Sequence, residues 1–262
     1  MKLTVLGSHA AGLRPGAFPT SQILEMRGHL MSIDCGEASQ LQLRKSKTKF
    51  ARLKRIFISH LHGDHFYGLI GLISSFQLLG RTTDMWIYGP KGLKEIIMLQ
   101  LELTNAYMSF PLHFIELDSD EPELIFEDDK ISVTTIPLRH RVYCNGFLFQ
   151  EKEGPRRINI EAVEKYNIDR AYFNRLKAGR DVPNKNAENI DNALVTFNPH
   201  PSKSYAFCSD TAYHPEIIPQ IQDVTLLYHE STFLNAHQHL CEKTKHSTAS
   251  QAAQIAAQAK VK

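Results

Sequence analysis

The sequence HLHGDH, which begins at His60, places three histidines, an aspartate and a glycine within six residues. In an extended backbone the side chains of His60 and His62 point to the same side, so both imidazoles can bind one metal ion. Gly63 permits a sharp turn that can direct Asp64 and His65 toward a second ion. A single histidine is more often an ordinary core or surface residue, but this density and spacing indicate a metal site.

Two apolar segments must position this cluster. Residues 55–58 (RIFI) are β-branched and aromatic and predict a short strand inside a covered sheet. The run from Gly68 to Leu79 is too long and too apolar for a loop and predicts a packed helix. The histidines therefore follow the carboxyl end of a strand, where open α/β sheets bind their ligands.

Other candidate side chains follow later predicted elements. They are His140 after the strand at 130–136, Asp210 after 204–209, Glu230 after 224–228, and His246 before the helix that runs to Lys260. Each is weak evidence alone, because a carboxylate beyond a strand commonly caps a helix. The same alternative applies to Asp34, and Ser247 is expected to cap the last helix. His237 and His239 have ligand-like spacing but are expected to face solvent.

The composition is that of an ordinary globular protein of 262 residues, with 42% hydrophobic and 22% charged residues. The formal net charge is only +2, so a nucleic-acid partner has to be argued from local patches. We find no signal peptide and no apolar run of membrane-spanning length. The lack of both predicts a cytoplasmic protein without a membrane partner, and the four scattered cysteines predict buried free thiols in a reducing compartment.

Two segments are locally basic. Residues 41–55 carry seven basic and no acidic side chains and form either a solvated face or a phosphate-attracting rim beside the metal cluster. Residues 151–180 carry eight basic and five acidic side chains, 8 − 5 = +3. Their apolar residues look too few for a core. We therefore expect a surface insertion at about 151–181, with a short helix around 159–166.

The run FISHLHGDHFYGL at 57–69 resembles ribonuclease Z, a family of the metallo-β-lactamase superfamily that contains the zinc endonucleases trimming the 3′ end of precursor tRNA. The resemblance extends along nearly the whole chain, through HRVYCNGF from residue 140, SDT at 209–211, HEST at 229–232 and HST at 246–248. It implies an α/β fold, a four-layer αββα sandwich of two mixed sheets, as a single domain over 1–262 with a protruding arm.

The resemblance also implies roles for the site residues. Two zinc ions would be bound, the first by His60, His62, His140 and Asp210 and the second by Asp64, His65 and the shared Asp210. Asp34 would orient ligands through hydrogen bonds. Asp64 would hold and deprotonate the attacking water. His246, steered by Glu230, would protonate the leaving 3′ oxygen.

In the family the insertion is an arm that grips the body of the tRNA. The basic residues expected to make this contact are Arg156, Arg157, Arg170, Arg175 and Lys177. The arm lacks the Gly-Pro pair expected near 169–171. The family continues beyond the position of Lys262 with a strand, a loop carrying one more histidine ligand of the second ion, and a closing segment; either this sequence is cut short or it departs from the family here. Membership also suggests a homodimer.

These observations predict a zinc-dependent endoribonuclease that cleaves precursor tRNA to remove the 3′ trailer. A second hypothesis is another hydrolase of the same fold, acting on small phosphodiesters or lactones, for which a remote tRNA grip would be needless. A third is a module that retains tRNA without cutting it, and which would bind one zinc ion or none.

Overall fold

The computed structural model describes residues 1–12 and 14–262 and divides into two compact units. The first unit joins Met1–Gln150 to Ser204–Lys262, and the second is the intervening Glu151–Lys203. Among the described residues, no helix is long and apolar enough to cross a membrane.

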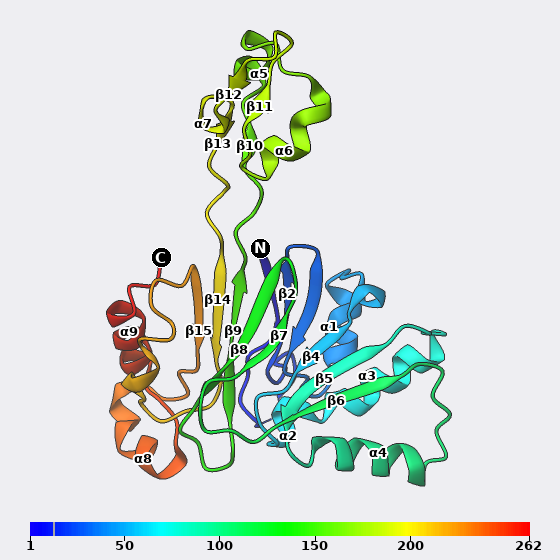
Figure 1. The fold of residues 1–262 in the computed structure, drawn as a ribbon. Helices are drawn as coiled ribbons and strands as arrows, with labels where there is room; N and C mark the ends of the chain where they lie inside the picture. The colour runs from blue at the N-terminus through cyan, green and yellow to red at the C-terminus, as the bar shows by residue number, and fades with distance from the viewer. Residues whose placement is uncertain (13) are drawn as a thin grey trace. The chain divides into compact units, whose positions relative to one another are not determined.

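The first unit begins with a six-stranded sheet in sequence order (Figure 1). Its strands are β1 Lys2–Gly7, β2 Ser21–Met26, β3 His29–Ile33, β4 Arg55–Phe57, β5 Met85–Pro90 and β6 Leu112–Leu117. The pairs β1–β2 and β2–β3 are antiparallel, whereas β3 through β6 are parallel. The strand and helix expected on either side of the histidine cluster are both present.

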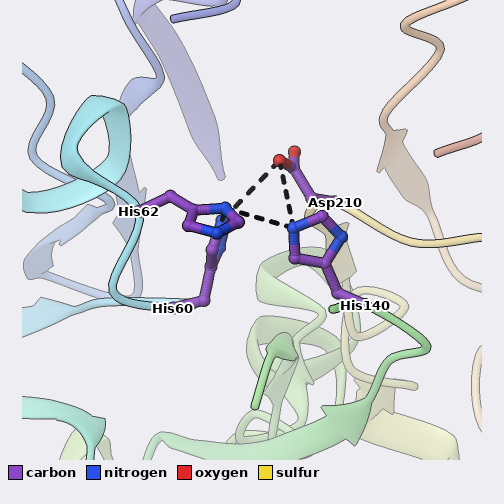
Figure 2. A group of neighbouring side chains, drawn as sticks. All are labelled: His60, His62, His140 and Asp210. Atoms are coloured by element: carbon purple, nitrogen blue, oxygen red, sulfur yellow. Dashed lines mark hydrogen bonds and ion pairs between the residues drawn. The ribbon is translucent and has the colours of Figure 1, made fainter. Parts of the chain in front are cut away.

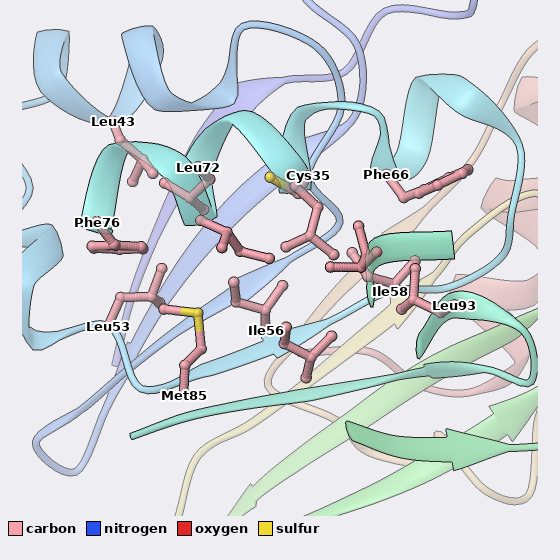
Figure 3. Close-up of a cluster of buried hydrophobic side chains, with 14 of the residues drawn as sticks. Cys35, Leu43, Leu53, Ile56, Ile58, Phe66, Leu72, Phe76, Met85 and Leu93 are labelled. Atoms are coloured by element: carbon pink, nitrogen blue, oxygen red, sulfur yellow. The ribbon is translucent and has the colours of Figure 1, made fainter. Parts of the chain in front are cut away.

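Helices cover one face of this sheet, as Figure 1 shows. They are α1 Ser39–Lys45, α3 Gly68–Leu78 and α4 Leu93–Leu103. Side chains such as Leu72 and Phe76 from α3 pack with Ile56 and Ile58 at β4, and the resulting apolar cluster is drawn in Figure 3. Ile56, Phe57 and Ile58 are all fully buried, so from Ile56 onward the sequence is continuously apolar rather than alternating.

A second sheet of five strands has the order β15-β14-β9-β8-β7. These strands are β7 Leu124–Glu127, β8 Ile131–Pro137, β9 Asn145–Glu151, β14 Ser204–Cys208 and β15 Leu226–His229. The helix α9 Ala249–Gln258 contributes Ile255 to an apolar cluster with Ala206 and Cys208 of β14. The short elements of this unit are η1 Phe50–Arg52, α2 Gly63–Phe66, η3 Pro215–Ile217, η4 Asn235–Leu240 and α8 Cys241–Thr244.

The two sheets pack face to face around an aromatic core. Phe57 of β4 stacks on Tyr88 with ring centroids 4.7 Å apart and meets Phe149 of β9 edge-on at 5.2 Å. The Tyr205 hydroxyl of β14 crosses between the sheets and donates a hydrogen bond to Gln22 Oε1 of β2. The predicted αββα sandwich is therefore confirmed.

The second unit has a small core of its own. Its elements are β10 Arg157–Ile158, α5 Ile160–Lys165, η2 Arg170–Tyr172, α6 Phe173–Lys177, β11 Val182–Pro183, β12 Asn189–Ile190, α7 Asn192–Val195 and β13 Thr196–Phe197. The helix expected around 159–166 is present. The interpretation that this segment has too few apolar residues for a core is wrong, because Val182, Ile190 and Val195, beyond the expected boundary at 181, pack with Val163 and Leu176.

Leu176 tests whether this core is independent of the first unit. Its side chain is fully buried, so Leu176→Ala should cost about 2–5 kcal/mol and destabilise the second unit alone. Limited proteolysis should then cut within 151–203 much faster than in the parent protein, while a chromogenic phosphodiester is still hydrolysed. Leu194→Ala is the matched control, because Leu194 is 53% exposed in the same unit. Equal protection of the L176A and L194A variants would contradict a separate core.

Candidate metal centre

The ends of three strands bring four candidate ligands together (Figure 2). His60 and His62 follow β4, His140 follows β8, and Asp210 follows β14. One ligand atom from each lies within 4.8 Å of the others. His62 Nδ1 is 3.1 Å from His60 Nε2 and 3.2 Å from His140 Nε2, and Asp210 Oδ2 is 3.6 Å from His60 Nε2. The structure therefore assembles the set predicted for a first ion.

The turn after His62 brings the next two side chains to Asp210 as well. Residue 62 is extended and α2 begins at Gly63, where a Cβ would lie 2.2 Å from the Tyr67 ring. His65 Nε2 then lies 3.5 Å from Asp64 Oδ2 and 3.6 Å from Asp210 Oδ2. Asp210 thus faces both groups, as a carboxylate shared between two cations must.

Asp34 is hydrogen-bonded to the candidate ligand His65 and does not cap a helix. The residue before α1 is Ala38, so the capping alternative for Asp34 is wrong. The Asp34 carboxylate is fully buried and accepts the Ser59 amide at 2.8 Å, the Ser59 hydroxyl at 3.0 Å and His65 Nδ1–H at 2.7 Å. Holding the proton on Nδ1 directs the His65 Nε2 atom toward the carboxylates.

Hydrogen bonds at Nδ1 also fix the rings of His60 and His140. Ser59 Oγ donates to Asp34 and so accepts from His60 Nδ1 at 3.0 Å. His140 Nδ1 donates to the Lys245 carbonyl at 3.0 Å. Both rings therefore present Nε2 to the cluster, whereas His62 presents Nδ1.

The electrostatics of the site suit a cation. Burial lowers the pKa of His60 to about 2 and also lowers the pKa values of His62 and His140, so these imidazoles are neutral, which is the form that binds metals. Despite its burial, a hydrogen bond and charge from His65 hold the pKa of Asp210 below its usual range. Three neutral imidazoles and one carboxylate match the nitrogen and oxygen ligands that zinc accepts.

His65 behaves differently. Burial opposes its charge, but Asp34 and Asp210 raise its pKa well above the usual value. The proton on Nε2 therefore lies between Asp64 and Asp210, at the position for which a second cation would compete. His65 Nε2, Asp64 Oδ2 and Asp210 Oδ2 are therefore the candidate ligands of a second ion.

Glu230 and His246 lie beside these ligands. Glu230 is buried and accepts the amides of Thr211 at 3.2 Å and Ser247 at 2.9 Å. Its carboxylate also bonds His246 Nδ1 at 3.1 Å, and His246 Nε2 is 3.9 Å from Asp210 Oδ2. Although burial opposes it, the hydrogen bond that His246 Nδ1 donates to Glu230 raises the pKa of His246.

The prediction for Ser247 is wrong, whereas the prediction for His237 and His239 is confirmed. Ser247 was expected to cap α9, but Thr248 does so, in a capping box with Gln251; the Ser247 hydroxyl instead donates to the Thr211 carbonyl at 2.7 Å. His237 and His239 lie exposed in η4, as expected.

A cavity of about 1080 Å³ opens over the ligands. His62, Asp64, His140 and Asp210 line it together with Glu230 and His246. Arg141 and Lys243 also line it, and sequence reasoning did not single them out. Arg141 Nη2 lies 3.1 Å from His62 Nε2. The sequence signal for Arg141 was its position directly after the candidate ligand His140. The Arg141 guanidinium places positive charge at the cavity.

The comparisons with known proteins agree with this geometry. The family model described as Anti-Pycsar protein Apyc1 matches residues 1–152. Ribonuclease Z of Bacteroides thetaiotaomicron is 47% identical over 100% of this chain and 83% of its own length, and that of Porphyromonas gingivalis strain W83 is 41% identical over 98% and 85%. The crystal structure of human tRNase Z, short form, has a TM-score of 0.74 and 25% identity, covering 100% of this chain and 90% of its own. The metallo-β-lactamase fold protein YhfI from Bacillus subtilis, with a TM-score of 0.64 and 16% identity over 99% of this chain and 82% of its own, shares the fold.

Substituting Asp34 tests its role in orienting His65 without changing any side chain that is proposed to bind the metal. We expect Asp34→Asn to lower zinc affinity about 10- to 100-fold, because the amide no longer holds the His65 proton on Nδ1. Competition with a chromophoric chelator measures the affinity. Asp84→Asn is the matched control, since Asp84 bonds His113 at 2.8 Å in an exposed pair. Unchanged zinc affinity in a folded D34N variant would refute the role.

Proposed function

This chain belongs to the ribonuclease Z family and is an endoribonuclease that processes the 3′ ends of tRNA, and we propose that it uses zinc bound by the ligands described above. The observation that carries the proposal is the convergence of His60, His62, His140 and Asp210 from three strand ends. We propose two ions, the second held by Asp64, His65 and the shared Asp210. The substrate is precursor tRNA, from which the 3′ trailer is removed.

The protein residues divide the reaction between them. Bound zinc supplies a Lewis acid that polarises phosphoryl oxygens and makes a nucleophile available at neutral pH. Asp64 lies at the start of α2 and lines the cavity, where its carboxylate can orient the attacking water and accept its proton. His246 Nε2, 3.9 Å from Asp210 Oδ2, can donate a proton to the leaving 3′ oxygen, while Glu230 holds the opposite ring nitrogen.

The general-acid role of His246 can be tested by changing the leaving group. His246→Ala should slow cleavage of precursor tRNA about 10²- to 10⁴-fold, because the 3′ alkoxide needs a proton to leave. Hydrolysis of bis(p-nitrophenyl) phosphate should fall far less, since nitrophenolate leaves without one. His237→Ala, at an exposed position in η4, is the control. Equal losses on both substrates would exclude His246 as the general acid.

The second unit is our candidate for gripping the tRNA. The basic residues predicted there are not equally available. Arg156 bonds Thr196 Oγ1 at 2.7 Å, Arg157 bonds the Asn198 carbonyl at 3.0 Å, and Arg175 bonds the Asp181 carbonyl at 3.2 Å. Arg170 and Lys177 are exposed. We therefore assign phosphate contact chiefly to Arg170 and Lys177. Arg156, Arg157 and Arg175 are assigned a mainly structural role. A remote RNA grip also favours tRNA over the alternative substrates, small phosphodiesters or lactones.

We expect the double variant Arg170→Ala with Lys177→Ala to weaken precursor tRNA binding without slowing bis(p-nitrophenyl) phosphate hydrolysis. Each lost phosphate contact should reduce the slope of log K against log salt by about 0.7 to 0.9. The double variant K165A/K185A removes the same charge from exposed positions of the same unit. Equal weakening by both double variants, or none by R170A/K177A, would contradict the assignment.

We further propose a homodimer and a cytoplasmic location. Several large apolar side chains are exposed on α4 and near the end of α3, and such exposure commonly marks an association surface; they are Leu78, Leu79, Leu99, Leu103 and Tyr107. The four cysteines are all buried and unpaired, which suits a reducing compartment.

A further inference from the structure

A second polar pocket of about 500 Å³ lies in the first unit, away from the metal centre. Its lining includes Arg27, Arg52, Lys54, Arg55, Trp86 and Lys130. It shares no lining residue with the cavity over the metal ligands. The enzyme mechanism described above makes no use of it.

The pocket lies at the opposite end of the parallel strands from the metal ligands. Arg55 begins β4 and pairs with Met31 of β3 and Trp86 of β5, so all three strands start here. His60 is five residues farther along, about 16 Å at 3.3 Å per extended residue. For the basic run at 41–55, a rim beside the active site was one of two hypotheses, the other being a solvated face. For Arg52, Lys54 and Arg55 the placement beside the active site is wrong, because β4 carries the chain away from them before the histidines begin.

The charge around the pocket is one-sided. Five of its lining side chains are cationic and none is acidic, in a chain whose net charge is only +2. The nearby carboxylate of Asp128 is occupied by His29, with Asp128 Oδ2 2.9 Å from His29 Nε2, and by the amides of Lys130 and Ile131. Several cations around one small volume repel one another and attract an anion of more than one charge.

Part of this lining is held rigidly. The Arg55 guanidinium lies 3.8 Å from the ring centroid of Phe126 and 5.4 Å from that of Trp86. Its Nε atom is buried and, among the described residues, has no hydrogen-bond partner. Arg52 Nη2 donates to the Gly28 carbonyl at 3.0 Å. A guanidinium fixed by aromatic rings needs little ordering to meet a planar pair of phosphate oxygens.

We propose that this pocket binds phosphate groups, supplied by an RNA strand or by a free polyphosphate. The bound phosphate is not the one that is cleaved, because the metal ligands lie at the far end of the same strands. For a substrate RNA, the pocket is a second contact on the nuclease body, separate from the basic residues at 151–203. The proposal does not depend on the catalytic assignment, since binding can be measured without turnover.

Lys54 and Lys130 are exposed, and their double substitution by alanine should leave the fold intact. Calorimetric titration with tripolyphosphate should show at least a tenfold loss of affinity in K54A/K130A. Filter binding of a precursor tRNA over a salt series should show a slope reduced by about 1.4 to 1.8 if RNA occupies the pocket. The control K49A/K94A removes two exposed lysines that do not line the pocket. Bis(p-nitrophenyl) phosphate hydrolysis reports the metal centre separately and should stay unchanged.

Each outcome decides between sources or overturns the proposal. Loss of tripolyphosphate and RNA affinity together identifies RNA as the source. Loss of tripolyphosphate affinity alone identifies a free polyphosphate. Equal effects of K54A/K130A and its control on both ligands, or no effect on either, would overturn the site and leave only diffuse surface charge.

Discussion

The metal centre depends on one fully buried carboxylate. Asp34 has no access to water, so its charge must be stabilised by hydrogen bonds from the protein. It receives two from Ser59 and one from His65, which join the end of β3 to the segment after β4 and to α2. Ser209 Oγ then donates to Ser59 Oγ at 2.9 Å and brings in the end of β14 from the second sheet. These hydrogen bonds therefore fix the ligands that follow the strands of one sheet relative to those that follow the strands of the other.

The hydrogen bonds around Asp34 explain why the ligands can be held in place with so little regular secondary structure of their own. The ligands His60, His62, His140 and Asp210 lie in loops, which alone would be mobile, and Asp64 and His65 lie in the single short turn of α2. Cys35 N–H donates to the His65 carbonyl at 2.7 Å, and Gly68 N–H donates to the Cys35 carbonyl at 2.9 Å, so the loop after β3 holds the C-terminal end of α2 and the start of α3. At Gly68 a Cβ would lie 2.0 Å from the Gly36 carbonyl oxygen, which shows how closely these backbones approach. Side chains that are already held in position lose little conformational entropy when a metal binds.

The parts of the structure that follow from short-range pattern could be predicted from the sequence. The apolar strand before His60, the helix after it and the grouping of His60 with His62 are local features, and family motifs supplied His140 and Asp210. Contacts between distant segments could not be predicted in this way. Thr248 rather than Ser247 caps α9 because Glu230 and Thr211 engage Ser247. The core around Leu176 was missed because half of its members lie beyond residue 181.

The parallel strands β3 to β5 give the first sheet two chemically different ends. The candidate ligands His60 and His62 follow the carboxyl end of β4, and the cationic pocket around Arg55 lies at the amino ends. A separation of about 16 Å along β4 is twice the Debye length of about 8 Å at physiological ionic strength. The two sites can therefore attract phosphates of one RNA strand without weakening each other, and a loss of charge at the pocket should leave the metal centre's electrostatics nearly unchanged.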